Sequence, residues 1–161
     1  MNNSVRILYI DDEEHNLQAF KANFRRDFKV FTAISGAEGL EIFKKEPGLN
    51  IILTDQRMPN MTGIEFLEEV QKLDPEPMRI LITGYSDINA VIDAINRGQV
   101  YRYLNKPWHY DDLKSTILAA YEVYSLRRQN KSLVSDLAEA NDDLERVNNQ
   151  LEFLLRQKLL S

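Results

Sequence analysis

Residues 51–63 read IILTDQRMPNMTG, and this stretch decides the fold. Its apolar run, residues 51–53, ends at Thr54 and Asp55, and turn-forming residues follow at once. A short apolar run bounded in this way predicts a strand that is buried on both faces. Asp55 would then lie at the carboxyl end of a central strand, the edge where open α/β sheets bind ligands. The stretch alone leaves three roles open for its carboxylate: metal ligand, nucleophile, or cap of the next helix.

The overall composition is that of a globular chain. The 161 residues are 43% hydrophobic and 28% charged, which is enough apolar material for a core. A net charge of −5 offers no basic surface, so we expect no direct binding of nucleic acid. Cysteine is absent, which excludes disulfide and thiol chemistry. No apolar stretch is long enough to span a membrane, and we expect a soluble, cytoplasmic protein.

Glycine and proline divide the chain in two. All 6 glycines and all 5 prolines lie at or before Pro107. Before this point, β-prone runs alternate with segments of helical spacing, which predicts an α/β domain with a doubly wound, five-stranded parallel sheet. The expected strands are residues 6–10, 28–34, the run from Ile51, 79–83 and 100–104. The expected helices are residues 14–27, 37–45, one after Gly63, and one capped by Asp87, with Ile88, Val91, Ile92 and Ile95 apolar, and closed by Gly98.

Polar residues follow four of the five expected strands. They are Asp11 and Asp12, then Asp55, Thr83 and Lys106. Because the carboxyl ends of parallel strands share one edge of a sheet, we expect these side chains to converge. Three neighbouring carboxylates repel one another unless positive charge lies between them. Lys106 supplies part of that charge, and a hard divalent cation such as Mg²⁺ would supply the rest.

With a cation bound, Asp55 is the best-placed nucleophile. A carboxylate that attacks phosphorus forms an acyl phosphate, and Lys106 and Thr83 would meet the phosphoryl oxygens. Each residue also has an ordinary interpretation: helix cap for an aspartate, solvated surface residue for Lys106, strand residue for Thr83. We favour the functional interpretation because all of them are expected at one edge.

The sequence resembles the receiver domain of two-component response regulators. The resemblance covers roughly residues 5–122, and we assign residues 1–122 to this domain. The matching residues are Asp11-Asp12, residues 55–63, Thr83-Gly84, Tyr103 and Lys106-Pro107. It implies a flavodoxin-like sheet of order 2-1-3-4-5. It also implies that Asp55 accepts a phosphoryl group from the phosphohistidine of a histidine kinase.

The resemblance further implies roles for individual residues. Asp12 and Asp55 would bind Mg²⁺ directly, Asp11 would act through water, and the backbone carbonyl of Arg57 would be a further ligand. On phosphorylation Thr83 would move toward the phosphoryl group, and Tyr103 would swing inward as the second part of the switch. Arg57 and Tyr85 occupy positions that flank the path of hydrolytic water in the family, so we expect slow hydrolysis.

An unbroken helical segment extends from Asp111 to the last residue. At 1.5 Å per residue it would reach about 75 Å. Its apolar residues follow a 3-4 spacing, which predicts a coiled coil over residues 123–161. Position a is occupied by Val123, Asn130, Leu137, Leu144 and Leu151. Position d is occupied by Leu126, Leu133, Ala140, Val147 and Leu154.

This pattern predicts a homodimer held by a parallel coiled coil. Asn130 is polar at position a, a device that specifies register and dimeric state. The segment stays apolar to its end, so we expect a C-terminal output domain or partner beyond it.

Three functions are compatible with these features. The favoured one is a phosphorylation-controlled dimeric signalling module that is not itself an enzyme, any catalytic output lying outside this chain. The alternative is a dimeric adaptor or scaffold that works without phosphorylation. An aspartate-nucleophile phosphatase is disfavoured, because such enzymes need a second aspartate two residues after the nucleophile, where this chain has Arg57.

Overall fold

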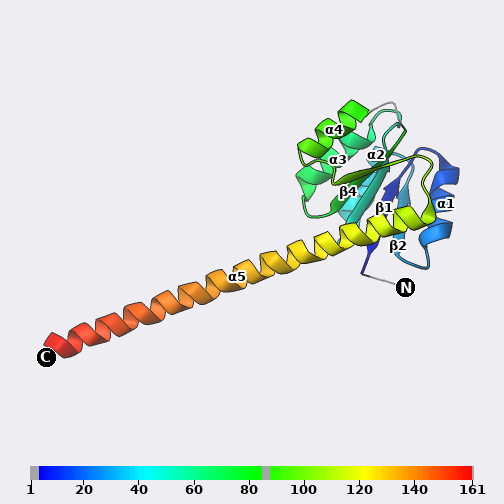
Figure 1. The fold of residues 1–161 in the computed structure, drawn as a ribbon. Helices are drawn as coiled ribbons and strands as arrows, with labels where there is room; N and C mark the ends of the chain where they lie inside the picture. Colours follow the sequence, from blue (N-terminus) through cyan, green and yellow to red (C-terminus); the bar gives the residue numbers. More distant parts are fainter. Residues whose placement is uncertain (1–3, 85–87, 161) are drawn as a thin grey trace. The chain divides into compact units, whose positions relative to one another are not determined.

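A five-stranded, fully parallel sheet forms the centre of the fold (Figure 1), with strand order β2-β1-β3-β4-β5. The computed structural model describes residues 4–84 and 88–160. The predicted doubly wound α/β architecture and its strand order are therefore confirmed. The strands are β1 (Arg6–Ile10), β2 (Lys29–Ala33), β3 (Ile51–Asp55), β4 (Met78–Thr83) and β5 (Arg102–Asn105). The helices are α1 (Glu14–Phe24), α2 (Gly36–Lys45), α3 (Gly63–Leu73), α4 (Ile88–Asn96) and α5 (Tyr110–Leu160).

The sheet separates two apolar layers. Side chains of a strand alternate between its faces, so Ile7 and Tyr9 point to one layer and Leu8 and Ile10 to the other. The first layer contains α1 and the first turns of α5, and the second contains α2, α3 and α4. All residues of β3 and β4 are buried, which explains why their sequences lack a polar alternation.

Several element boundaries differ from the sequence prediction. The first helix ends at Phe24 instead of Asp27, and the backbone N–H of Phe28 donates to the Phe24 carbonyl as the chain turns. The last strand begins at Arg102, because the N–H of Val100 still donates to the Ala94 carbonyl at the end of α4. Residues whose β propensity suggested a strand are therefore held in the turns that follow helices, because their N–H groups donate to carbonyls at the helix ends.

Helix α4 buries less of its apolar surface than its sequence suggests. Val91 and Ala94 are buried, whereas Ile88 is 47% and Ile92 46% exposed. The helix contacts the sheet along the Val91–Ala94 line, and its two exposed isoleucines lie to the side of it. Asp87, the predicted cap, lies outside the described residues.

A buried arginine stabilises the edge of the sheet where the strands begin. Arg79, at the start of β4, donates to the carbonyls of Pro75 and Pro77 on one side and of Gly98 and Gln99 on the other. These carbonyls belong to the α3–β4 and α4–β5 connections. Hydrogen bonds to charged groups are worth about 1.5–3 kcal/mol each, so one guanidinium stabilises both connections.

The long helix α5 is divided between two compact units, which meet between Tyr124 and Ser125. In the first unit Leu113, Ile117 and Ala120 are buried in the core, and Val123 packs partly against it. Val123, predicted as the first a position, thus belongs to the globular unit. The start of α5 is also tied to the α1–β2 connection, since the Tyr110 hydroxyl donates to Asp27 and Lys114 lies 3.2 Å from the same carboxylate.

The second unit consists of the rest of α5. The leucines and valines at its predicted a and d positions are 50–68% exposed. A helix with this much exposed apolar surface lacks a core of its own. Among the described residues, no helix is both long enough and apolar enough to cross a membrane.

Gly63 brings the first turn of α3 against the end of β3. Its N–H donates to the Gln56 carbonyl at 3.0 Å, and the side-chain amide of Gln56 accepts from the N–H of Ile64. A Cβ atom at Gly63 would lie 2.3 Å from the Asp55 carbonyl oxygen and 2.8 Å from Leu81. Only glycine allows this approach, because the obstructing atom is backbone.

We expect Gly63→Ala to lower the free energy of unfolding by roughly 2–4 kcal/mol, since the helix must move away from the strand to relieve the clash. Urea unfolding followed by circular dichroism measures the change. Gly84→Ala is the matched control, because a Cβ there meets nothing within 4 Å. Equal stability of the two variants would contradict the close-packing argument.

Candidate functional site

The polar residues predicted at the carboxyl edge of the sheet all lie there, and Asp11, Asp12, Asp55 and Lys106 are close together. Asp11 follows β1 directly, Asp55 ends β3, Thr83 ends β4, and Lys106 follows β5. Asp11 is fully buried, and Asp55 and Thr83 are 6% and 2% exposed. The N–H of Lys106 donates to the Thr83 carbonyl, which extends the β4–β5 pairing to the edge. Four parallel strands thus bring these residues to one edge of the sheet, where Asp11, Asp55 and Thr83 are shielded from solvent.

Three carboxylates share this site. One oxygen from each of Asp11, Asp12 and Asp55 can be chosen so that all three lie within 4.8 Å of one another. Carboxylate oxygens at this spacing suit a hard divalent cation such as Mg²⁺, which combines one or two carboxylates with water. The donor chemistry and spacing of the described residues therefore fit such an ion.

Lys106 is the cation nearest to these carboxylates among the described residues. Its Nζ lies 2.9 Å from Asp55 Oδ1 and 3.7 Å from Asp11 Oδ2. Burial alone would lower the pKa of Lys106, but the hydrogen bond to Asp55 and the charges of Asp11 and Asp55 raise it. Lys106 therefore stays protonated and remains a fixed positive charge.

Asp55 is held in an unfavourable environment for its charge. Burial raises the pKa of its carboxyl above the ordinary value, although the hydrogen bond and charge of Lys106 act in the opposite direction. The backbone N–H of Gln56 also donates to Asp55 Oδ1, at 2.9 Å. Both contacts fall on the same oxygen, so within residues 4–84 and 88–160 the contacts of Asp55 leave the lone pairs of Oδ2 available.

Asp11 is the most heavily hydrogen-bonded of the three carboxylates. The Tyr9 hydroxyl donates to Oδ2 at 2.8 Å, the Asn16 side-chain amide donates to Oδ2 at 3.1 Å, and the N–H of Glu13 donates to Oδ1 at 3.0 Å. Burial raises the pKa of the Tyr9 phenol, and the negative charge of Asp11 raises it further. Tyr9 is therefore a hydrogen-bond donor at this site.

The sequence prediction missed Tyr9 and Asn16. One signal for Tyr9 was available, because a tyrosine inside an otherwise apolar strand needs a partner for its hydroxyl. The nearest polar candidate on the same pleat face was Asp11, two residues later. Asn16 carried no comparable signal.

The two predicted switch residues, Thr83 and Tyr103, make different contacts. The Thr83 hydroxyl donates to the Gly84 carbonyl at 3.0 Å, and Tyr103 packs, partly buried, against the α2–α3–α4 layer. Arg57 is exposed. A movement of Thr83 and Tyr103 and a metal contact of the Arg57 carbonyl stay predictions. Tyr85 lies outside the described residues.

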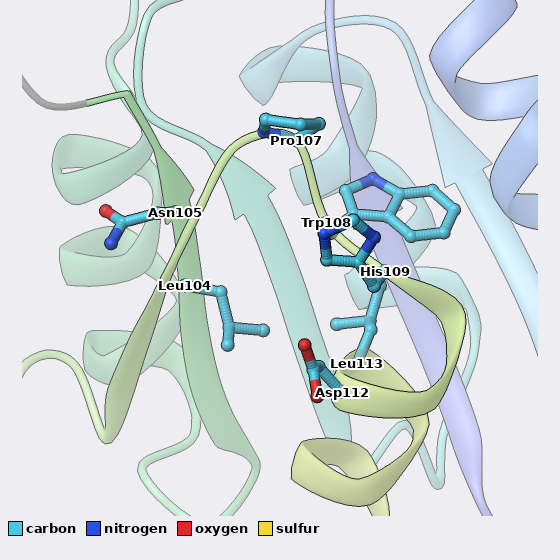
Figure 2. A pocket seen from close by; sticks show the side chains of 7 residues that line it. All are labelled: Leu104, Asn105, Pro107, Trp108, His109, Asp112 and Leu113. Atoms are coloured by element: carbon cyan, nitrogen blue, oxygen red, sulfur yellow. The ribbon is translucent and has the colours of Figure 1, made fainter.

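A small pocket of about 250 Å³ lies where the chain passes from β5 into α5 (Figure 2). Leu104 and Leu113 line it together with the exposed His109. The indole of Trp108 points away toward α1 and packs against Phe20 and Phe24, with ring centroids 6.1 and 5.9 Å apart. Trp108 thus connects the residue pair Lys106-Pro107 to the first core layer.

Comparisons with known proteins agree with this geometry. Residues 7–118 match the family model of the response regulator receiver domain. The hydrogenase transcriptional regulatory protein HoxA of Bradyrhizobium diazoefficiens is 32% identical over 88% of this chain and 29% of its own length. HoxA of Cupriavidus necator is 38% identical over 75% of this chain and 25% of its own length. The chain therefore spans less than a third of these relatives.

Two solved structures show the same fold at comparable identity. A crystal structure described as adenylate cyclase from Rhodopirellula baltica has a TM-score of 0.79 and 36% identity, covering 83% of this chain and 98% of that chain. A response regulator receiver domain protein from Clostridium thermocellum has a TM-score of 0.72 and 35% identity, covering 76% of this chain and 98% of its own.

We expect Lys106→Met to raise the pKa of the Asp55 carboxyl further, because the variant removes the hydrogen bond and charge that lower it. The measurement is a ¹³C NMR titration of the aspartate carboxyl groups in protein freed of divalent cations. Lys114→Met is the control, since it removes a lysine that pairs with Asp27 instead. An unchanged Asp55 titration in Lys106→Met would contradict the assigned ion pair.

Proposed function

The chain belongs to the response regulator receiver domain family, and from this premise we propose that it is a phosphoacceptor module of a two-component phosphorelay. Its phosphodonor would be a histidine kinase. The observation that carries the proposal is the buried Asp55 carboxylate, 2.9 Å from the Lys106 ammonium and beside two further aspartates. This arrangement has a nucleophile, a fixed cation and metal-ligand oxygens in one site.

The proposed metal site uses the acidic cluster. Asp12, Asp55 and the Arg57 carbonyl would hold Mg²⁺ directly, and Asp11 would act through water. Three carboxylates and one ammonium leave two negative charges, which one Mg²⁺ ion balances. When bound, the ion would neutralise charge on the transferred phosphoryl group.

Asp55 would act as the nucleophile. In the proposed step, an oxygen of its carboxylate, Oδ2, bonds to phosphorus as the phosphorus–nitrogen bond of the phosphohistidine breaks. The electron pair of that bond returns to the histidine of the kinase, and an acyl phosphate remains on Asp55. Lys106 would keep one contact with Asp55 and extend another to a phosphoryl oxygen.

Phosphorylation would then change the partners of Thr83. Its hydroxyl would leave the Gly84 carbonyl and donate to a phosphoryl oxygen, and Tyr103 would move into the space released. Charge-assisted hydrogen bonds are worth about 1.5–3 kcal/mol each. Two or three of them would supply the roughly 5.5 kcal/mol that shifts a two-state equilibrium from 1:99 to 99:1.

The second unit would carry the change onward as a homodimer. We propose a parallel coiled coil that buries the a and d side chains of residues 126–154, with Asn130 specifying register. The exposed apolar surface of this unit is the supporting observation. The same surface also supports the alternative, a dimeric adaptor that works without phosphorylation.

The output would lie outside the phosphoacceptor site. The relatives described above carry names as different as transcriptional regulatory protein and adenylate cyclase. We therefore propose a C-terminal output domain or a separate partner, without enzymatic turnover in this chain itself. We also propose a cytoplasmic location and no insertion into a membrane. The net charge of −5 is the reason for proposing no direct contact with nucleic acid.

We expect the protein to gain one phosphoryl group, on Asp55, when it is incubated with acetyl phosphate and Mg²⁺. Intact-mass spectrometry followed by peptide mapping measures the modification. Asp55→Asn should abolish it, because an amide is a poor nucleophile, and Asp142→Asn in the second unit should leave it unchanged. An unmodified wild-type protein, or one labelled elsewhere, would contradict the proposal.

We expect Leu137→Asp to weaken the dimer by roughly a hundredfold or more, because it places two charges in the proposed seam. Multi-angle light scattering across a dilution series measures the dissociation constant. Ser135→Asp is the control, since it adds the same charge two residues away, outside the a and d positions. A monomeric wild-type protein at high concentration would exclude the coiled coil.

A further inference from the structure

Asp11 is the carboxylate whose geometry the surrounding structure specifies most closely. Its Oδ2 accepts from the Tyr9 hydroxyl and the Asn16 amide, and it also faces Lys106 at 3.7 Å. Its Oδ1 accepts one hydrogen bond from the described residues, from the N–H of Glu13. A carboxylate oxygen has two lone-pair sites, so Oδ2 is filled and Oδ1 retains capacity.

Tyr9 is held rigidly by the first core layer. Its side chain is fully buried in β1, and its ring lies 4.5 Å from the ring of Phe20, centroid to centroid. Phe20 in turn meets the edge of Trp108. A phenol has an ordinary pKa of about 10, so the hydroxyl is protonated near neutral pH and can only reach Asp11 as a donor. The core therefore fixes the position of this donor.

We propose that Tyr9 is a positioning residue of the divalent-cation site. By donating to Oδ2 of Asp11, together with Asn16, it holds this carboxylate in the orientation in which one of its oxygens lies within 4.8 Å of oxygens of Asp12 and Asp55. This inference rests on the proposed function, because it concerns the same acidic cluster. It assigns the cation affinity of the site partly to a side chain that does not itself touch the ion.

Hydrogen-bond partners of metal ligands have effects of a known size. Replacing such a partner typically reduces metal affinity by about 10–100-fold, because the ligand loses its orientation. If Tyr9 served only to fill the core, Tyr9→Phe would leave the cation affinity unchanged, because phenylalanine fills nearly the same volume. The two roles therefore predict different results for Tyr9→Phe.

The first test compares cation binding in the wild type, Tyr9→Phe and Tyr121→Phe. Binding of Mn²⁺, which prefers the same oxygen ligands as Mg²⁺, is followed by the electron paramagnetic resonance signal of the free ion. We expect Tyr9→Phe to raise the dissociation constant about tenfold. Tyr121→Phe should bind as the wild type does, because it removes a hydroxyl from a tyrosine packed on the same layer but stacked against Tyr124.

The second test measures phosphorylation by acetyl phosphate as Mg²⁺ is varied. We expect Tyr9→Phe to need about tenfold more Mg²⁺ for half-maximal rate, while its rate at saturating Mg²⁺ stays within about twofold of the wild type. Asn16→Ala, at a partly exposed helix position, should shift the Mg²⁺ requirement in the same direction. This second variant keeps the test valid if Tyr9→Phe folds poorly.

The results separate this inference from the proposed function. An unchanged Mn²⁺ dissociation constant in folded Tyr9→Phe, or a lower saturating rate with an unchanged Mg²⁺ requirement, would overturn the positioning role. Wild-type protein that resists phosphorylation while its Mn²⁺ affinity still depends on Tyr9 would overturn the proposed function and support the inference.

Discussion

The repulsion between three carboxylates at one edge of the sheet is the constraint on which the rest of this structure depends. Parallel strands bring Asp11, Asp12 and Asp55 together, and the burial of Asp11 and Asp55 limits the screening of their charges by water. Lys106 offsets one of the three charges through its contacts with Asp55 and Asp11. The site therefore attracts further positive charge, and this is the property that a divalent cation would exploit.

The same constraint affects stability. The pKa of Asp55 is raised in the folded protein, mainly by burial, so the folded state binds a proton at this residue more readily than the unfolded chain does. Stability that this proton provides is present at acidic pH and is lost as the pH rises through the folded-state pKa. Above that pKa the ionised Asp55 carboxylate works against folding, and the two apolar layers on either side of the sheet offset that cost.

Helix α5 connects two regions with different stabilising interactions. Its first turns are held by Leu113, Ile117 and the contacts of Tyr110 and Lys114 with Asp27. Its remaining turns have no core residues, and their leucines stay exposed. A single continuous helix thus passes from a segment stabilised by its own domain to one whose apolar stripe is exposed.

The sheet, its polar edge and the long helix can all be predicted from the order of residues alone. Apolar runs that end at Asp11, Asp55, Thr83 and Lys106 specify where strands stop, and parallel topology then brings those ends together. Helical spacing and the absence of glycine and proline after Pro107 likewise predict α5. These are periodic or local properties of the sequence, so they can be predicted without knowing how the side chains pack.

The individual atomic contacts, in contrast, were set by the tertiary structure. It paired Tyr9 and Asn16 with one oxygen of Asp11, turned the Thr83 hydroxyl to the Gly84 carbonyl, and packed a partly buried Val123 against the first core layer. It also made β5 begin at Arg102, two residues later than predicted, and left Ile88 and Ile92 exposed. Each outcome depends on rotamers, helix ends and the relative placement of distant elements, because hydrogen bonds are sensitive to tenths of an ångström that sequence spacing does not encode.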